Sequence, residues 1–269
     1  MKRLFRLLFI TIHAIQAPLV AVIIETQHFE NITNYTDSTT LVILDIDDTI
    51  LIPTQTLGTD VWFRARIQEH KENGKSSQEA LQQTVFDWEA VRKLSDVCLV
   101  EANIPTIIAN MQNQGIAVIG LTTQGYSLAR RTHHQLLNLD INLELTAPSK
   151  ENYYFIQNNH GVLYSQGVLF TGGTNKGTAL LTLLNQISHF PKKIIFINDK
   201  ETHIKEVEST LEGTAIEFIG LRYSYSDERI SNYRQEIADI QWKHSTFERI
   251  LSDEEAEKII RQIQHNNNN

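Results

Sequence analysis

Carboxylate side chains follow two apolar runs of the chain. Leu41-Val-Ile-Leu44 leads directly into Asp45, Asp47 and Asp48, and Ile194-Ile-Phe-Ile197 leads into Asn198-Asp199. Aspartates this close together repel one another unless a cation compensates their charge, and hard oxygen ligands of this kind suit Mg²⁺. A solvated acidic turn is the alternative interpretation of the first cluster. Paired with a second acid after another apolar run, the cluster indicates a cation-dependent site.

Hydroxyl and ammonium groups occur at comparable places. Thr122 and Thr123 follow the apolar run 116–121, and their hydroxyls and backbone N–H groups could hold the oxygens of a phosphoryl group. Lys176 stands beside Gly177 at the predicted start of a helix, where a cation adds to the positive end of the helix dipole. Each residue alone is also typical of a turn, a helix cap or a solvated surface. Their order along the chain is more specific than any one of them.

The elements that must position these residues alternate between strands and helices. Strands are expected near 19–24, 41–44, 116–121, 193–197 and 216–221, with helices near 105–115, 126–139, 176–187 and 202–211 between them. This alternation predicts an α/β fold: a three-layer, doubly wound, largely parallel sheet with helices on both faces. The carboxyl ends of parallel strands share one edge of a sheet, so the candidate residues are expected to meet there.

The ordered set resembles the haloacid-dehalogenase (HAD) superfamily of phosphohydrolases, including exported bacterial members. Asp45-Ile-Asp47-Asp-Thr49 matches the first motif of that family, Thr122 the second, Lys176 the third and Asn198-Asp199 the fourth. The resemblance covers about residues 20–223. It implies a HAD-like Rossmannoid core with a small helical cap inserted after the first motif. It also implies a Mg²⁺-dependent phosphohydrolase of a small phosphorylated metabolite, working through an aspartyl-phosphate intermediate.

The resemblance assigns roles residue by residue. Asp45 would be the nucleophile and Asp47 the acid and base. Thr122, Thr123 and Lys176 would bind the phosphoryl oxygens, and Asp45, Asp47 and Asp199 would hold Mg²⁺, Asp47 through its backbone carbonyl. Three residues depart from the family pattern: Asn198 replaces the first acid of an acidic pair, His203 stands where some members carry a further acidic or amide residue, and Gln124 stands where many phosphatases carry arginine. The first two departures could weaken metal binding, and the third could alter substrate preference.

The long stretch between Asp45 and Thr122 predicts a separate cap. The expected division is a signal-like segment over 1–21, a core over 22–57 and 104–269, and a helical cap over 58–103. Substrate selection is expected from Trp62, Arg64 and Arg66 of the cap, where arginine could recognise a second anionic group, and from Gln124. The alternative is that the cap aromatics form its own core and that the arginines are solvated.

Composition and the N-terminus bound the partners and the location. The 24 basic and 32 acidic residues give a net charge of −8, which does not favour nucleic acid. Lys2, Arg3 and Arg6 precede an uncharged, largely apolar run that resembles a secretory signal. A periplasmic or secreted protein is therefore expected, with a cytoplasmic one as the alternative and membrane contact only through an uncleaved N-terminal segment. The expected partner is a small phosphorylated substrate.

Two further functions share these residues. A HAD-fold binding or effector protein with little or no turnover is suggested by Asn198, Gln124 and the signal-like segment. A phosphotransferase would use the same side chains with a different acceptor.

Overall fold

The computed structural model describes residues 21–246 and 249–267, so the signal-like segment lies outside the described residues except for Ala21. The strands are β1 (Ala21–Thr26), β2 (Thr40–Leu44), β3 (Leu51–Pro53), β4 (Val97–Leu99), β5 (Ala117–Thr122), β6 (Tyr153–Gln157), β7 (His160–Ser165), β8 (Val168–Phe170), β9 (Lys193–Asn198) and β10 (Glu217–Tyr223). The α-helices are α1 (Asp60–Glu72), α2 (Ser77–Leu94), α3 (Ile104–Asn113), α4 (Ala129–Asn138), α5 (Lys176–Gln186), α6 (Glu201–Leu211), α7 (Asp227–Ser231), α8 (Gln235–His244) and α9 (Asp253–Asn267). Two short 3₁₀ helices, η1 (Phe29–Tyr35) and η2 (Tyr126–Leu128), complete the set.

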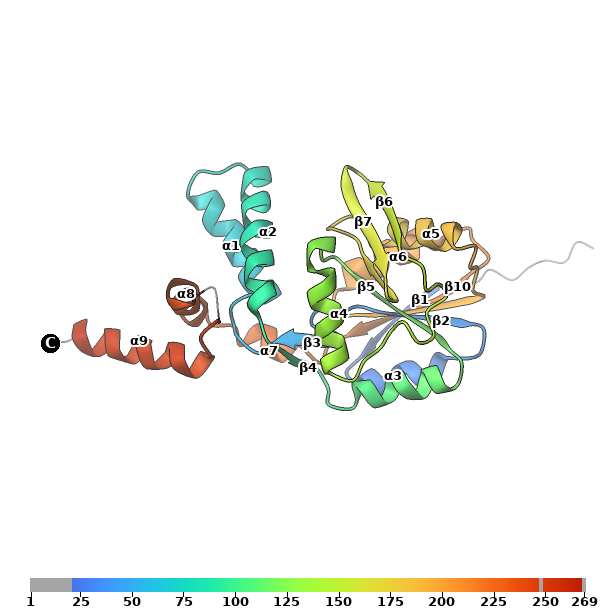
Figure 1. Ribbon diagram of the computed structural model, residues 1–269, viewed down its shortest axis with the longest axis horizontal. Helices are drawn as coiled ribbons and strands as arrows, with labels where there is room; N and C mark the ends of the chain where they lie inside the picture. The colour runs from blue at the N-terminus through green and yellow to red at the C-terminus, as the bar shows by residue number, and fades with distance from the viewer. Residues whose placement is uncertain (1–20, 247–248, 268–269) are drawn as a thin grey trace, which may run out of the picture.

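An 8-stranded sheet forms the centre of the molecule, in the order β1-β10-β9-β2-β5-β8-β7-β6 (Figure 1). Every pair from β1 to β8 is parallel, and β7 and β6 extend the sheet as antiparallel strands. The predicted α/β fold with a largely parallel sheet is therefore confirmed. β2 lies between β5 and β9, where the chain changes the side of the sheet to which it adds strands, and ligands typically bind at the carboxyl ends of strands at such a point.

Helices cover both faces of the sheet because alternate residues of each strand point to opposite sides. Val42 and Leu44 of β2 join a core with η1, α3 and α4, whereas Leu41 and Ile43 join a second core with α5 and α6. All five residues of β2 are buried. The central strand is thus enclosed, and its polar continuation begins at Asp45.

Two helices begin at capping boxes, each formed by two residues three positions apart in the chain. The Ser76 hydroxyl accepts a hydrogen bond from the Glu79 N–H while the Glu79 carboxylate accepts one from the Ser76 N–H, which forms a capping box at the start of α2. Ser252 and Glu255 exchange the same bonds before α9. Both helices therefore begin where local sequence alone specifies.

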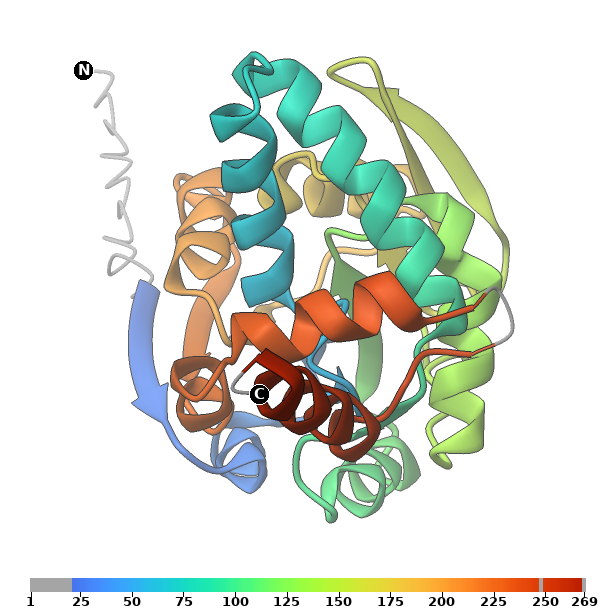
Figure 2. The same ribbon diagram turned by 90° about the vertical axis from the view of Figure 1, so that its left-hand side faces the viewer.

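α1 and α2 form a helical pair that stands beside the sheet on the two-stranded ribbon β3–β4 (Figure 1). Of the C-terminal helices, α8 packs on this pair and crosses it in Figure 2, and α9 packs on α8. Trp62 of α1 lies 5.7 Å from Trp242 of α8 between ring centroids, and the Gln241 side chain accepts a hydrogen bond from the Leu57 N–H at 2.8 Å. The division of the chain at residues 58 and 103 remains a prediction, but α8 adds contacts to the cap that the division did not include.

Gly177 sets the distance between α5 and α6. A Cβ at this position would lie 2.3 Å from the Glu206 carbonyl oxygen and 2.3 Å from Thr210 Oγ1. Gly177→Ala is expected to lower the free energy of unfolding by about 1–3 kcal/mol because the helices must separate. Urea denaturation measures the loss, with Thr178→Ala at an exposed position of α5 as the control. A stability change equal to that of the control would contradict the packing argument.

His133 predicts a pH dependence of stability. Its ring lies 5.4 Å from that of Phe170, and burial lowers the pKa of His133 to about 4. An unfolded histidine has a pKa near 6.5, so between pH 6.5 and 4 the unfolded chain binds more protons than the folded protein. The free energy of unfolding therefore decreases as the pH is lowered through this range. For this partly exposed ring the loss is expected to be roughly 1 kcal/mol between pH 7 and 5. His133→Phe should reduce that loss in urea denaturation, whereas His134→Phe on the exposed side should leave it unchanged.

Candidate active site

Asp45 and Lys176 form a buried ion pair at the carboxyl end of β2. The Asp45 N–H donates to the Ile197 carbonyl at 3.0 Å, which holds the residue between β2 and β9. Lys176 Nζ lies 2.5 Å from Asp45 Oδ1, and the Lys176 side chain is fully buried. Burial raises the pKa of Asp45, and the neighbouring ammonium opposes this shift. The pair therefore presents a carboxylate whose negative charge is balanced by the buried ammonium of Lys176.

Asp47 is held on both carboxylate oxygens. Arg92 of α2 donates to Oδ1 at 2.5 Å, and the Gln124 amide donates to Oδ2 at 2.7 Å. The Thr132 hydroxyl donates to Gln124 Oε1 at 2.6 Å, which fixes the orientation of the amide. The guanidinium of Arg92 also lies over the Trp88 ring. A residue of the cap thus contacts a residue of the strand end directly.

Asp199 brings a second acid to the same edge from β9. Its N–H donates to Thr49 Oγ1 at 3.2 Å, and its buried Oδ1 has no hydrogen-bond partner among the described residues. Burial, and next the charge of Asp45, raise the pKa of Asp199 well above its ordinary value. An unpartnered carboxylate oxygen beside another acid suits a hard cation.

The donor set limits how such a cation would be held. Residues 21–246 and 249–267 contain no group of three or more His, Cys, Asp or Glu side chains placed to hold a metal ion. Asp45 and Asp199 can supply two oxygens, and Mg²⁺ commonly completes its shell with waters and few protein groups. The residues therefore fit a Mg²⁺ ion with two carboxylates and a largely hydrated shell.

The loop after β5 is fixed to the loop after β8. The Thr171 N–H donates to the Thr122 carbonyl at 2.9 Å, and the Gly173 N–H donates to that of Thr123 at 2.9 Å. Thr122 Oγ1 accepts a hydrogen bond from the Gln124 N–H at 3.1 Å, which leaves the hydroxyl hydrogen available to donate. Thr122 is buried and Thr123 is exposed at the cleft. The loop offers both threonines on a rigid support.

Asp48 belongs to the predicted acidic cluster without an assigned role, and Asp60 and Lys200 of the site were not predicted. Asp48 has a φ of 59° in the left-handed region, and burial with the nearby charges of Asp47 and Asp60 raises its pKa to about 6. Lys200 donates to Asp60 at 2.7 Å. Burial opposes the charge of Lys200, but Asp60 and Asp199 outweigh it and raise its pKa. The position of Lys200 directly after Asn198-Asp199 was a signal in the sequence that could have identified it.

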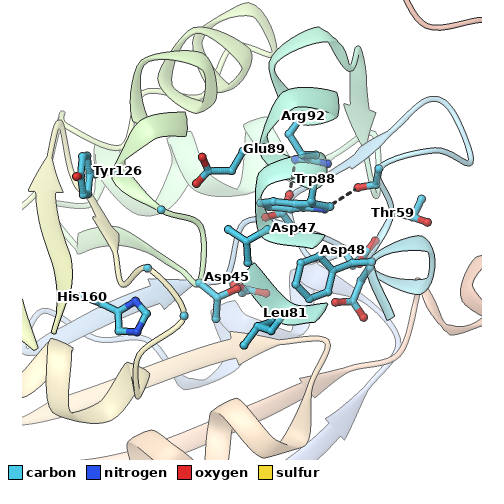
Figure 3. Close-up of a pocket in the computed structure, with 18 of the residues that line it drawn as sticks. Asp45, Asp47, Asp48, Thr59, Leu81, Trp88, Glu89, Arg92, Tyr126 and His160 are labelled. Atoms are coloured by element: carbon cyan, nitrogen blue, oxygen red, sulfur yellow. Dashed lines mark hydrogen bonds and ion pairs between the residues drawn. The ribbon is translucent and has the colours of Figure 1, made fainter. Parts of the chain in front are cut away.

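A cleft of about 620 Å³ separates these groups from the cap (Figure 3). Its lining includes Asp45, Asp47, Asp48, Thr59, Asp60, Phe63, Leu81, Val85, Trp88, Glu89, Arg92, Thr123, Tyr126, His160, Lys200 and His203. Burial and the charges of Lys176 and Lys200 lower the pKa of His203 to about 2, so its imidazole is neutral. The cleft combines a charged floor with a cap that supplies both apolar side chains, among them Leu81, Val85 and Trp88, and polar ones.

The structure brings seven of the predicted residues together at one edge of the sheet, where Asp45, Asp47 and Thr123 line the cleft, and it places three elsewhere. Asp45, Asp47, Thr122, Thr123, Gln124, Lys176 and Asp199 gather at the carboxyl edge of the sheet.

Trp62, Arg64 and Arg66 of α1 lie elsewhere. Trp62 is buried in the cap against Trp242, Arg64 pairs with Asp60, and Arg66 pairs with Asp87 and Glu69. The arginine that reaches the site is Arg92, and the aromatic residues that line the cleft are Phe63, Trp88 and Tyr126. The alternative that the sequence left open, an aromatic cap core, describes Trp62.

The fold and the site define an α/β protein with a charged cleft at the carboxyl edge of a largely parallel sheet, beneath a helical cap. The chain belongs to the family described as "Protein of unknown function (DUF2608)", whose model matches residues 25–257. That range includes every predicted site residue.

Curated relatives match over nearly their whole length. Two proteins of Chlamydia pneumoniae, each named "Putative outer membrane protein", are 26% and 28% identical to this chain. The matches cover 91% of this chain and 92% of the first relative, and 86% of this chain and 86% of the second. An "Uncharacterized protein" of Rickettsia prowazekii is 24% identical over 88% of this chain and 89% of its own length. In the part of this chain that the structure describes, no helix is both long enough and apolar enough to cross a membrane.

Proposed function

We propose that this protein is a Mg²⁺-dependent phosphohydrolase of small phosphate monoesters with a HAD-like core. The observation that carries the proposal is the meeting of Asp45 with Lys176 at the end of the central strand. Asp47, Thr122 and Asp199 complete the set from the same loop and the two neighbouring strands. Nucleophile, acid–base group, phosphoryl-binding groups and a metal-binding acid are all available at one edge.

Asp45 is the proposed nucleophile. Its carboxylate oxygen attacks phosphorus as the bond to the leaving oxygen breaks, which gives an aspartyl-phosphate and the free alcohol. Lys176 and the Thr122 hydroxyl hold the phosphoryl oxygens, whose charge spreads as the bond breaks. Water then attacks the aspartyl-phosphate, which releases inorganic phosphate and restores the carboxylate. The burial of the Asp45–Lys176 pair keeps the nucleophile oriented through both steps.

Asp47 is the proposed acid and base. In the first step its protonated carboxyl gives a proton to the leaving oxygen, and in the second step its carboxylate takes one from water. Arg92 and Gln124 donate to both of its oxygens, so each oxygen of Asp47 already has a partner within the chain. One of these two donors must therefore move aside before Asp47 can contact the leaving oxygen.

Asp45 and Asp199 are the side chains that would hold Mg²⁺. When bound, the ion would offset the charge of the incoming phosphoryl group and of the acids around it.

Phosphate release tests the proposal. The purified protein is incubated with phenyl phosphate and a panel of phosphorylated metabolites, with Mg²⁺ and with EDTA. Release that requires Mg²⁺ supports the proposal, and glycerol added as an acceptor separates hydrolysis from phosphotransfer. Absence of release from every substrate by folded protein would reject it.

A binding protein with little turnover is the second candidate. The observation in its favour is that both oxygens of Asp47 are occupied by residues of the chain itself. This candidate predicts Mg²⁺ binding in calorimetry without aspartyl-phosphate formation. Beryllium fluoride, whose complex with a nucleophilic aspartate mimics the aspartyl-phosphate, should then form no complex with Asp45.

We also propose that the protein is exported. The basic N-terminus with its apolar run and the names of the chlamydial relatives support this location. Fusing residues 1–40 to a reporter enzyme that is active only outside the cytoplasm tests it. An inactive but stable fusion would favour the cytoplasmic alternative.

A further inference from the structure

The cap presents an apolar surface to the cleft. Leu81, Val85 and Trp88 follow one another at helical spacing along one side of α2, and Phe63 of α1 joins them in the lining. Leu81 is 46% exposed and Val85 39% exposed. Tyr126, which is 53% exposed, lines the cleft from the core (Figure 3). Apolar side chains that border a cleft without protein cover are typical of a ligand-binding surface.

Glu89 is the charged residue of α2 that stands beside this surface. A Cβ on Gly125 would lie 2.8 Å from Glu89 Oε1, so the carboxylate lies against the loop that carries Thr123. Figure 3 shows it directed into the cleft between Arg92 and Tyr126. Within the described residues, Glu89 forms no hydrogen bond or ion pair. Its carboxylate is therefore free of a direct ion pair with any side chain that the structure describes.

The lysine and arginine side chains of the described cleft are already paired. Arg92 binds Asp47, Lys200 binds Asp60, and Lys176 is buried against Asp45. Arg64 and Arg66 pair with acids outside the cleft. A second anionic group on a ligand would thus meet Glu89 rather than an unpaired guanidinium or ammonium group. Two negative charges brought together within one cleft repel each other.

We propose that the cleft accepts phosphate monoesters whose leaving group is a planar ring without a second anion, and that Glu89 excludes anionic leaving groups. This inference rests on the proposed function for the reaction and adds its substrate class. The ring packs against Leu81, Val85 and Trp88 while the phosphoryl group reaches Asp45. A neutral ring is accepted, and a cationic substituent on the ring is attracted by Glu89.

The hydrolysis test compares three substrates with similar alcohol leaving groups: benzyl phosphate, 4-carboxybenzyl phosphate and glycerol 1-phosphate. Benzyl phosphate is expected to exceed glycerol phosphate in kcat/KM by about tenfold or more, because the ring buries apolar surface. It is expected to exceed 4-carboxybenzyl phosphate by about five- to tenfold because of repulsion by Glu89. Equal values for the three substrates would overturn the inference.

Matched variants assign these preferences to residues. Glu89→Gln should bring the ratio of benzyl to 4-carboxybenzyl phosphate close to one, whereas Glu72→Gln, the same charge change at an exposed site of α1, should preserve it. Leu81→Asn with Val85→Asn should lower the preference for the ring about fivefold. Phe86→Asn, at a 71% exposed residue of α2 that does not line the cleft, should preserve that preference. Ratios that respond equally to test and control variants would reject the assigned residues.

Calorimetric titration with phosphonates separates the two proposals because phosphonates are not hydrolysed. Benzylphosphonate should bind more tightly than methylphosphonate, and 4-carboxybenzylphosphonate should gain affinity on Glu89→Gln. This pattern without any hydrolysis would reject the phosphohydrolase and retain the ligand class. Hydrolysis without the pattern would retain the enzyme and reject the ligand class. The absence of both hydrolysis and the binding pattern would reject both proposals.

Discussion

Asp45→Asn is expected to lower the rate of phosphate release by about 10³-fold or more. The substitution keeps the size of the side chain and replaces the attacking carboxylate oxygen with an amide, which is not a comparable nucleophile. The amide oxygen can still accept a hydrogen bond from Lys176, but the buried ammonium loses its counter-charge, so the variant is expected to be folded and less stable than the wild type. The measurement is kcat for phenyl phosphate with saturating Mg²⁺, alongside circular dichroism of the variant.

Two controls make the result specific. Asp96→Asn removes an equally small carboxylate whose side chain is 81% exposed, and it should retain the full rate. Beryllium fluoride, which forms a complex with a nucleophilic aspartate, should inhibit the wild type by binding the Asp45 carboxylate. The Asp45→Asn variant lacks that carboxylate and should not form the complex. A folded Asp45→Asn protein with wild-type kcat would exclude the aspartyl-phosphate mechanism.

Lys176→Met is expected to lower the free energy of unfolding by about 3–5 kcal/mol. Methionine approximates the length of lysine but leaves Asp45 buried without its partner, and an isolated buried charge is strongly destabilising. The backbone N–H of Lys176 keeps its bond to Glu206 at 3.0 Å, so the start of α5 is unchanged. Urea denaturation without Mg²⁺ measures the loss.

The double variant Lys176→Met/Asp45→Asn tests the reason for that loss. Removing both charges eliminates the unpaired carboxylate, so the double variant should recover at least about 2 kcal/mol relative to Lys176→Met alone. Lys205→Met removes an exposed lysine paired with Glu201 and should leave the free energy of unfolding nearly unchanged. Additive losses in the double variant would show that Lys176 stabilises the fold through packing rather than charge.

Local sequence predicted the elements and one edge of the site. The apolar runs before Asp45, Thr122 and Asp199 are buried strands in the structure, and capping boxes at Ser76 and Ser252 start α2 and α9. These features depend on neighbours in the chain, because strand burial and helix capping are set within a few residues. Parallel strands then bring their carboxyl ends together without further information.

The cap was predicted less completely, because its contacts join residues far apart in the chain. Arg92 and Phe86 lie on the same helix, and its apolar pattern does not reveal which side faces the cleft. Arg92 reaches Asp47 across 45 positions, and Leu57 meets Gln241 across 184. The sequence predicted that the site would include Trp62, Arg64 and Arg66 of α1, the helix that follows the Asp45 motif. In the structure, one face of α2 supplies most of the cap residues that line the cleft.

By itself, the sequence determined the largely parallel α/β fold, the strand ends that carry Asp45, Thr122 and Asp199, and the helix start that carries Lys176. Those features follow from hydrophobic periodicity and from the fixed geometry of parallel strands. Only the tertiary structure decided that Lys176 is buried against Asp45, that Arg92 and Gln124 hold Asp47, and that Glu89 stands unpaired in the cleft. These contacts depend on how α2, α5 and the loop after β5 come together at the end of β2, and packing between distant segments is set by the shapes of whole surfaces rather than by any local pattern.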